Sequence, residues 1–164
     1  MTAMSSTIES LYSDRVKALA ADIPRTERLA APDASVTMTS PLCGSRITVD
    51  LVLDDGRVAD FGQTVRACTL GQASASIMGR HVVGRSADEV RTVAKALRAM
   101  LKEGAPSPEG EWADLSVLAP AQRFKSRHGS IMLAFDAVVA ALDDIQGLRP
   151  EDAPAKGLPD TMRV

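Results

Sequence analysis

Aromatic residues are scarce in this sequence: they make up 3% of 164 residues, as one tryptophan, one tyrosine and three phenylalanines. A strong charge imbalance is also missing, because 19 Lys and Arg residues stand against 21 Asp and Glu residues, a net charge of -2. Nucleic-acid-binding proteins need a basic surface and often aromatic side chains on which bases stack. The composition therefore argues against a dedicated nucleic-acid binder.

Long hydrophobic runs are absent as well. No apolar stretch approaches the ~18 residues of a membrane span, and the first residues, MTAMSSTIES, lack the basic and apolar regions of a secretory signal. The remaining composition, 45% apolar and 24% charged, is typical of a globular protein, and the length fits one domain. We therefore expect a cytoplasmic protein with no membrane partner.

Cysteine and histidine are rare, with two residues of each type: Cys43, Cys68, His81 and His128. Two cysteines are too few for a disulfide scaffold or for a four-cysteine zinc site. The sequence also lacks a Walker glycine loop, a dinucleotide-binding fingerprint and a His-Glu-x-x-His motif. We expect a protein that is not an enzyme, and any thiol chemistry must use the two cysteines with other residue types as helpers.

Hydrophobic periodicity and capping residues predict the order of the elements. They indicate a helix over 5–21, strands over 35–39, 46–53 and 57–66, helices over 67–78, 86–104 and 129–145, and a short buried turn that begins at Trp112 and is cut by Pro120. Strands followed by helices are typical of an α+β domain. We expect this domain to span 5–145, with a flexible C-terminal tail over 146–164.

The predicted hairpin brings the two cysteines together. Asp55-Gly56 is a strong signal for a two-residue turn, in which paired positions sum to 111. Cys43 and Cys68 also sum to 111, so an unbroken ladder places them opposite each other with Cβ atoms roughly 4.5–5.5 Å apart. A shared soft-metal or sulfur site at the far end of the hairpin is one interpretation. Two small buried hydrophobes and a disulfide are the others.

The register of this hairpin contains a conflict. Side chains alternate between the two faces of a strand, so Val58 points to one face of the return strand, whereas Phe61 and Val65 point to the other. A bulge near Ala59 or Asp60 reconciles the two sets. The resulting one-residue slip leaves the thiols as neighbours at the same end of the sheet.

The segments around the two cysteines resemble a known family. Ser40-Pro41-Leu42-Cys43-Gly44, the Asp-Gly hairpin, and Ala67-Cys68 leading into Ala73-Ser74-Ala75-Ser76 are similar to the IscU, SufU and NifU N-terminal family of iron–sulfur cluster scaffolds, over about residues 8–143. The resemblance implies an α+β fold of the IscU type, a three-stranded antiparallel sheet with helices packed on one face. It also implies a site of three cysteines and one aspartate that binds zinc or assembles a [2Fe–2S] cluster, with sulfur supplied by a cysteine desulfurase.

Carried over by position, the family site is incomplete in this chain. Cys43 matches the first family cysteine and Cys68 the second, but Ser45 replaces the aspartate. Because a [2Fe–2S] cluster needs four protein ligands and a serine hydroxyl is a poor one, a single protomer is not expected to hold a cluster tightly. Whether a dimer compensates for the missing ligands is left open.

The third family cysteine, which opens the last helix, is also replaced. Anchoring on Met132-Leu133-Ala134 puts Ser130 at its place, and one inserted residue puts Gly129 there, with His128 matching a family histidine. His128 is then either a metal ligand or a solvated or helix-capping residue. The basic residues beside it form either a solvated face or a group that favours a bound thiolate or persulfide by charge; they are Arg123, Lys125 and Arg127.

The hypothesis from the sequence is a divergent iron–sulfur cluster assembly scaffold. It binds iron, zinc or a nascent [2Fe–2S] cluster through Cys43 and Cys68, with His128 or Ser130 completing the site weakly. Cys68 is the favoured sulfur acceptor because the start of a helix favours a thiolate. The alternatives are a sulfur-transfer accessory that accepts persulfide from the desulfurase, and a metal-free binding module derived from the scaffold. Recipient apo-proteins are further candidate partners.

Overall fold

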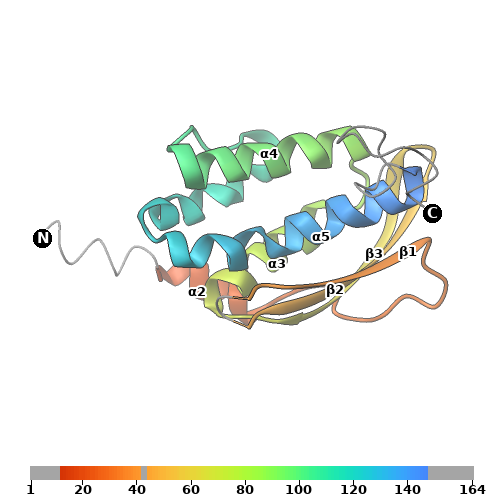
Figure 1. Ribbon diagram of the computed structural model, residues 1–164, viewed down its shortest axis with the longest axis horizontal. Helices are drawn as coiled ribbons and strands as arrows, with labels where there is room; N and C mark the ends of the chain where they lie inside the picture. The colour runs from red at the N-terminus through yellow and green to blue at the C-terminus, as the bar shows by residue number, and fades with distance from the viewer. Residues whose placement is uncertain (1–11, 42–43, 148–164) are drawn as a thin grey trace, which may run out of the picture.

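The computed structural model describes residues 12–41 and 44–147. In chain order, the elements of this part are α2 (Asp14–Ala21), β1 (Ala34–Thr39), β2 (Arg46–Asp54), β3 (Arg57–Arg66), α3 (Thr69–His81), α4 (Ala87–Glu103), the 3₁₀ segments η1 (Gly110–Arg123) and η2 (Lys125–Arg127), and α5 (His128–Gln146). Figure 1 shows the sheet as one layer, α3 and α5 above it, and α4 beyond them. No helix in the described ranges is both long and apolar enough to cross a membrane.

Within the described residues, three antiparallel strands form one sheet in the order β1-β2-β3. Alternate residues of β2, namely Ile47, Val49 and Leu51, are buried on the face that α5 covers. The α+β class, with a three-stranded antiparallel sheet and helices on one face, is therefore confirmed.

The β2–β3 hairpin contains the expected bulge. Leu53 pairs with Val58 and Val52 with Asp60, so Ala59 has no partner and the register shifts by one residue. At the turn, Asp55 and Gly56 have φ values of 53° and 77°, as a type I′ turn requires. Because of the shift, the ladder ends with Arg46 opposite Arg66, and Cys68 lies two residues beyond that end.

The helix boundaries follow their caps. The Ser86 hydroxyl accepts a hydrogen bond from Glu89 N and begins α4, and Gly104 ends it with a φ of 72°. At the N-terminal side, Ser13 caps α2, so the predicted continuous helix over 5–21 is wrong at this point. The reason is that the Ser13 hydroxyl accepts a hydrogen bond from Val16 N, which starts a helix there. The Ser6–Glu9 capping box lies outside the described residues.

The segment η1 is longer than the short turn predicted from the sequence. Its buried residues recur every three positions, the period of a 3₁₀ helix; they are Trp112, Leu115, Leu118 and Ala121. Trp112 is 3% exposed, and its ring meets those of His81 and Phe135 edge to face at centroid distances of 5.7 and 5.8 Å. Pro120 is accommodated within this segment rather than ending it.

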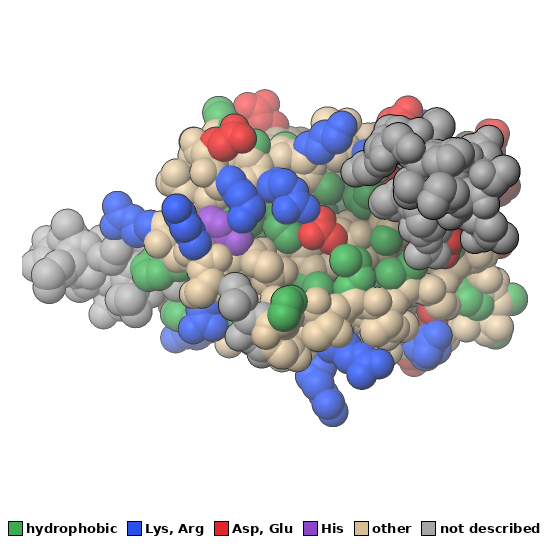
Figure 2. Space-filling view, in the orientation of Figure 1, with side chains coloured by type: hydrophobic (Ala, Val, Ile, Leu, Met, Phe, Trp, Pro, Cys, Tyr) green, Lys and Arg blue, Asp and Glu red, His purple; other side chains and the backbone are tan. Residues whose placement is uncertain are grey.

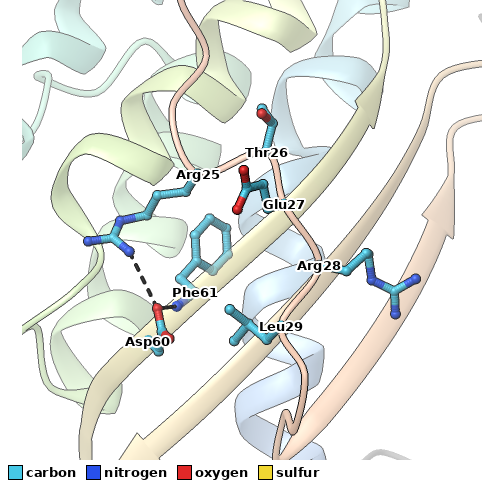
Figure 3. A pocket seen from close by; sticks show the side chains of 7 residues that line it. All are labelled: Arg25, Thr26, Glu27, Arg28, Leu29, Asp60 and Phe61. Atoms are coloured by element: carbon cyan, nitrogen blue, oxygen red, sulfur yellow. Dashed lines mark hydrogen bonds and ion pairs between the residues drawn. The ribbon is translucent and has the colours of Figure 1, made fainter.

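The connector 22–33 crosses the sheet face that points away from the helices. Arg25 O accepts a hydrogen bond from Gln63 N of β3, at 2.9 Å. Next along the connector, a Cβ at Gly62 would collide with the Glu27 carbonyl oxygen, so glycine is required for this close approach. Figure 3 shows the connector passing in front of β3, where it borders a groove of about 370 Å³.

A buried carboxylate fastens the connector to the central strand. Asp50 of β2 is fully buried and receives two hydrogen bonds from Arg28, at 2.7 and 3.1 Å, and one from Leu29 N at 3.0 Å. The Ser35 hydroxyl donates a further bond. Burial alone raises the pKa of Asp50, but these hydrogen bonds and the Arg28 charge outweigh it and hold that pKa below its ordinary value.

Candidate functional site

Cys68 lies where β3 gives way to α3. Its backbone is extended, with φ −69° and ψ 171°, and it is the N-cap residue of α3, as expected from the sequence. The side chain is half-buried and its thiol is free. It makes no capping hydrogen bond to its own helix, so the sulfur atom is directed to other partners.

The partner of that sulfur is Ser130, in the first turn of α5. Cys68 Sγ lies 3.2 Å from Ser130 Oγ, and Ser130 Oγ lies 3.2 Å from Ser45 Oγ. Both serines are buried, at 1% and 3% exposure. The three side chains therefore form a chain of hydrogen bonds that joins the starts of β2, α3 and α5.

The turn before β2 supports Ser45 through its backbone. Ser40 N donates to Ser45 O at 2.8 Å, and Gly44 N donates to Ser40 O at 2.9 Å. Gly44 has a φ of 71°, in the left-handed region that favours glycine. Leu42 and Cys43 lie outside the described residues, so the predicted pairing of the two thiols stays a prediction.

Close contact between α3 and α5 determines where Ser130 points. A Cβ at Gly71, one turn along α3 from Cys68, would collide with Ser130 Oγ. Another small residue of α3, Ser74, donates its hydroxyl hydrogen bond to Ile131 O at 2.7 Å. Small side chains thus let the two helices approach until Ser130 reaches Cys68.

The two alternatives for the third family cysteine now differ in position. Ser130 contacts Cys68, whereas Gly129 is exposed and faces the loop before β2, where a Cβ would lie 3.0 Å from Ser40 Oγ. Position 130 is therefore the one that lies against the second cysteine.

His128 is buried, at 2% exposure, and is not the solvated residue that one interpretation expected. It does not cap the helix either, because Arg127 is the N-cap residue of α5. Its Nε2 donates to Ala121 O at 2.8 Å, and its buried Nδ1 has no hydrogen-bond partner among the described residues. Residues two apart on a helix point to different sides, so His128 and Ser130 do not face the same neighbour.

Three basic residues precede α5. Arg123 and Lys125 are exposed and Arg127 is half-buried, and none of them forms an ion pair with an acidic residue in the described part of the chain. The other histidine, His81, pairs with an acidic residue. Its Nε2 lies 3.1 Å from Asp114 Oδ2, and Arg15 also contacts the Asp114 carboxylate. The His81 hydrogen bond is the main cause that lowers the pKa of Asp114.

The donor set decides what chemistry this cluster supports. One thiol and two hydroxyls meet at its centre, and a hydroxyl ligates a metal weakly because its proton is hard to remove near neutral pH. In the described residues, no group of three or more His, Cys, Asp or Glu side chains is placed to hold a metal ion. Among the residues that the structure describes, this cluster therefore offers a soft metal a single strong ligand, Cys68.

Two residues that shape the site were missed from the sequence. Gly71 leaves space for the Ser130 side chain because it has no Cβ, and the backbone of Ser40 forms the hydrogen bonds of the turn before β2. Gly71 carried a signal, because it lies three residues after Cys68 on the face of α3 that continues to Ser74. Ser40 opens the segment that carries the family resemblance, but its backbone hydrogen bonds to Gly44 and Ser45 were not marked by any side-chain pattern.

Comparison with known proteins gives a consistent result. Residues 12–147 match the family described as NifU-like N terminal domain. The scaffold protein IscU for iron–sulfur cluster assembly from Streptococcus pyogenes serotype M1 is 26% identical over 108 residues, covering 66% of this chain and 68% of that protein. The zinc-dependent sulfurtransferase SufU of Bacillus subtilis (strain 168) is 24% identical over 115 residues, covering 70% and 78%.

A solved structure extends the similarity to three dimensions. The crystal structure of a nitrogen-fixing NifU-like protein (N-terminal) from Brucella abortus is 45% identical to this chain. The match covers 87% of this chain and 99% of the other, with a TM-score of 0.85.

Proposed function

We propose that this chain, which belongs to the family of NifU-like N-terminal domains, is a divergent scaffold whose cargo is iron, zinc or a nascent [2Fe–2S] cluster held through Cys43 and Cys68. The family is one of iron–sulfur cluster assembly scaffolds. The observation that carries the proposal is the contact of Cys68 with Ser130 and, through it, with Ser45. These are the positions at which the resemblance expects the second cysteine, the third cysteine and the aspartate.

Hydroxyls in two ligand positions make the proposed cargo transient. Thiolates hold zinc and iron–sulfur clusters, whereas protonated hydroxyls bind them weakly. Release is then easy, which suits a protein that passes its cargo to recipient apo-proteins. A cysteine desulfurase is the proposed sulfur donor, and the cytoplasm is the proposed location.

His128 is the remaining proposed ligand. A neutral ring whose Nε2 donates to Ala121 O has a lone pair on Nδ1. Metal-bound histidines typically donate their second ring nitrogen to a carbonyl in this way. The buried, unpartnered Nδ1 supports the proposal. The helical spacing from Ser130 opposes it, because it turns His128 away from the Cys68 side of α5.

A second candidate function is acceptance of persulfide sulfur. The Cys68 thiolate attacks the outer sulfur of the desulfurase persulfide; a new S–S bond forms at Cys68, the old one breaks, and the desulfurase cysteine leaves as a thiolate. The Ser130 hydroxyl favours this candidate because it lies 3.2 Å from Cys68 Sγ and can donate a hydrogen bond to that sulfur.

The test is anaerobic reconstitution with iron and sulfide beside a zinc titration, followed by absorbance and metal content per chain. We expect Cys43→Ser and Cys68→Ser each to lose most bound metal, and His128→Ala to lose part of it. His81→Ala is the matched control and should bind as the wild type does. If the wild type binds neither metal but takes sulfur from a cysteine desulfurase, and only one cysteine is needed, the persulfide acceptor replaces the scaffold.

A further inference from the structure

The outer face of the sheet carries a row of basic and hydroxyl side chains beside the candidate site. The register places Thr39, Arg46 and Arg66 side by side across β1, β2 and β3. The next residues on the same face, two positions further from the site, are Thr37, Thr48 and Thr64. We call these six residues the Arg-Thr face.

This face is open while its continuation is covered. Two positions further along, Asp50 and Gly62 lie under the connector, which the Arg28 hydrogen bonds and the close approach of Glu27 hold in place. By contrast, Arg46, Arg66, Thr48 and Thr64 line a depression of about 290 Å³. Figure 2 shows basic side chains projecting along the lower rim, on the side of the sheet that points away from the helices.

The arrangement of the two arginines is unfavourable for the isolated fold. Arg46 and Arg66 are directly opposite each other on antiparallel strands, and like charges in such pairs are destabilising. Both are exposed, and neither forms an ion pair with an acidic residue in the described ranges. None of the six residues is acidic. An anion from outside the chain would relieve this repulsion.

The position of the Arg-Thr face ties it to the site. Arg46 follows Ser45 directly, and Arg66 precedes Cys68 by two residues. Side chains alternate faces along a strand, so Arg46 and Arg66 point away from the helices whereas Ser45 points toward α5. A partner that rests on this face therefore lies at the same end of the sheet as the Cys68–Ser130–Ser45 cluster and must reach around that end to contact Cys68. The hydroxyls add hydrogen-bonding groups to the charges, and one of them, Thr37 Oγ1, lies 2.7 Å from Thr48 Oγ1.

We propose that the Arg-Thr face docks carboxylate side chains of the sulfur donor, so that an acidic surface of the cysteine desulfurase sits on Arg46 and Arg66 with its persulfide beside Cys68. The identity of the partner rests on the proposed function, and the acidic chemistry rests on the two arginines. Guanidinium groups pair with carboxylates in a planar, two-bond geometry. A nucleic acid fits less well, because the face has no aromatic side chain for stacking and the chain has a net charge of -2.

The test measures binding of the purified chain to the cysteine desulfurase of the same organism by biolayer interferometry. The double variant Arg46→Glu/Arg66→Glu should bind at least about tenfold more weakly, because like charges then face each other across the interface. Lys17→Glu/Lys102→Glu, which makes the same change in net charge at exposed positions of α2 and α4, is the matched control and should bind normally. Wild-type binding should weaken as salt rises from about 0.1 to 1 M, over which the Debye length falls from ~10 to ~3 Å.

A stability readout separates docking from misfolding. The single variant Arg66→Glu places opposite charges across the strands, so its Tm should rise by ~1–2 °C while binding weakens. Unchanged binding by the Arg46→Glu/Arg66→Glu variant, with wild-type metal content, overturns this inference and leaves the proposed function standing. Failure of the wild type to bind metal overturns the proposed function, whereas a wild type that binds metal but does not bind the desulfurase overturns this inference.

Discussion

Replacing Gly71 by alanine tests the close contact that places Ser130 against Cys68. In an ordinary helix, Gly→Ala stabilises by ~0.5–1 kcal/mol. In α3 the added methyl group would collide with Ser130 Oγ and crowd two further atoms, Ala67 Cβ at 2.9 Å and Ser130 O at 3.2 Å. The serine side chain can rotate away, but Ser130 O and Ala67 Cβ can move only with the backbone.

The magnitude follows from what rotation of Ser130 costs. It breaks the hydrogen bonds to Cys68 and Ser45, worth ~0.5–1.5 kcal/mol each. Crowding of the remaining atoms adds ~1–3 kcal/mol, as overpacking generally does. After the gain in helix propensity is subtracted, we expect Gly71→Ala to lower the free energy of unfolding by ~1–5 kcal/mol, which is a fall in Tm of roughly 2–20 °C.

The assay is a double-mutant cycle in urea with Ser130→Ala. Because that variant lacks the hydroxyl that the new methyl group strikes, Gly71→Ala should cost less in it, with a coupling energy of about 1 kcal/mol. In a Cys43→Ser background, displacement of the Ser130 hydroxyl should also change the rate at which Cys68 reacts with a disulfide reagent. A Gly71→Ala protein at least as stable as the wild type, with no coupling to position 130, would refute the reasoning.

Three further predictions address the site and the connector. Ser130→Cys adds a third thiol beside Cys68 and should raise zinc affinity at least about tenfold in a chelator competition; unchanged affinity would mean that position 130 does not face the metal. Asp50→Asn should lower the free energy of unfolding by ~1–3 kcal/mol, measured by urea unfolding at pH 7. Because the pKa of Asp50 is lowered in the folded state, the wild type should be more stable than this variant above the unfolded pKa of about 3.9, and the difference in stability should shrink as pH falls below that value. A difference in stability that is equal at pH 7 and pH 3 would contradict the proposed role of the Asp50 charge. Gly62→Ala should push the connector away from β3, lower the free energy of unfolding by ~1–3 kcal/mol and speed tryptic cleavage after Arg25 and Arg28. Stability and cleavage rates equal to those of the wild type would contradict the close approach of the connector to Gly62.

The local pattern was sufficient to predict much of this fold. Alternation of apolar residues from Ile47 to Leu53 predicted β2, and the parity conflict between Val58 and Phe61 predicted the bulge that shifts the ladder at Ala59. The helix start at Cys68 was also predicted correctly. These features are set by neighbours in sequence, which is why a single chain without relatives reveals them.

Features that depend on distant partners were not predictable in the same way. The connector is held to the sheet by Asp50 and Arg28, which are 22 residues apart and carry no motif. The choice between Ser130 and Gly129 also required the structure, because one residue of shift at the start of α5 changes which side chain meets Cys68. The threefold spacing that starts at Trp112 was present in the sequence, but a short apolar repeat cut by Pro120 suggested a turn rather than η1.

The packing of Trp112 provides an intrinsic optical probe of this molecule. Since it is the sole tryptophan, emission excited at the red edge of indole absorption comes from one place, the seam where η1 covers α3 and α5. Those two helices also carry Cys68 and Ser130. Any movement of α3 or α5 that shifts His81 or Phe135 against the indole changes its surroundings, and a fluorescence spectrometer can follow such a movement without a label.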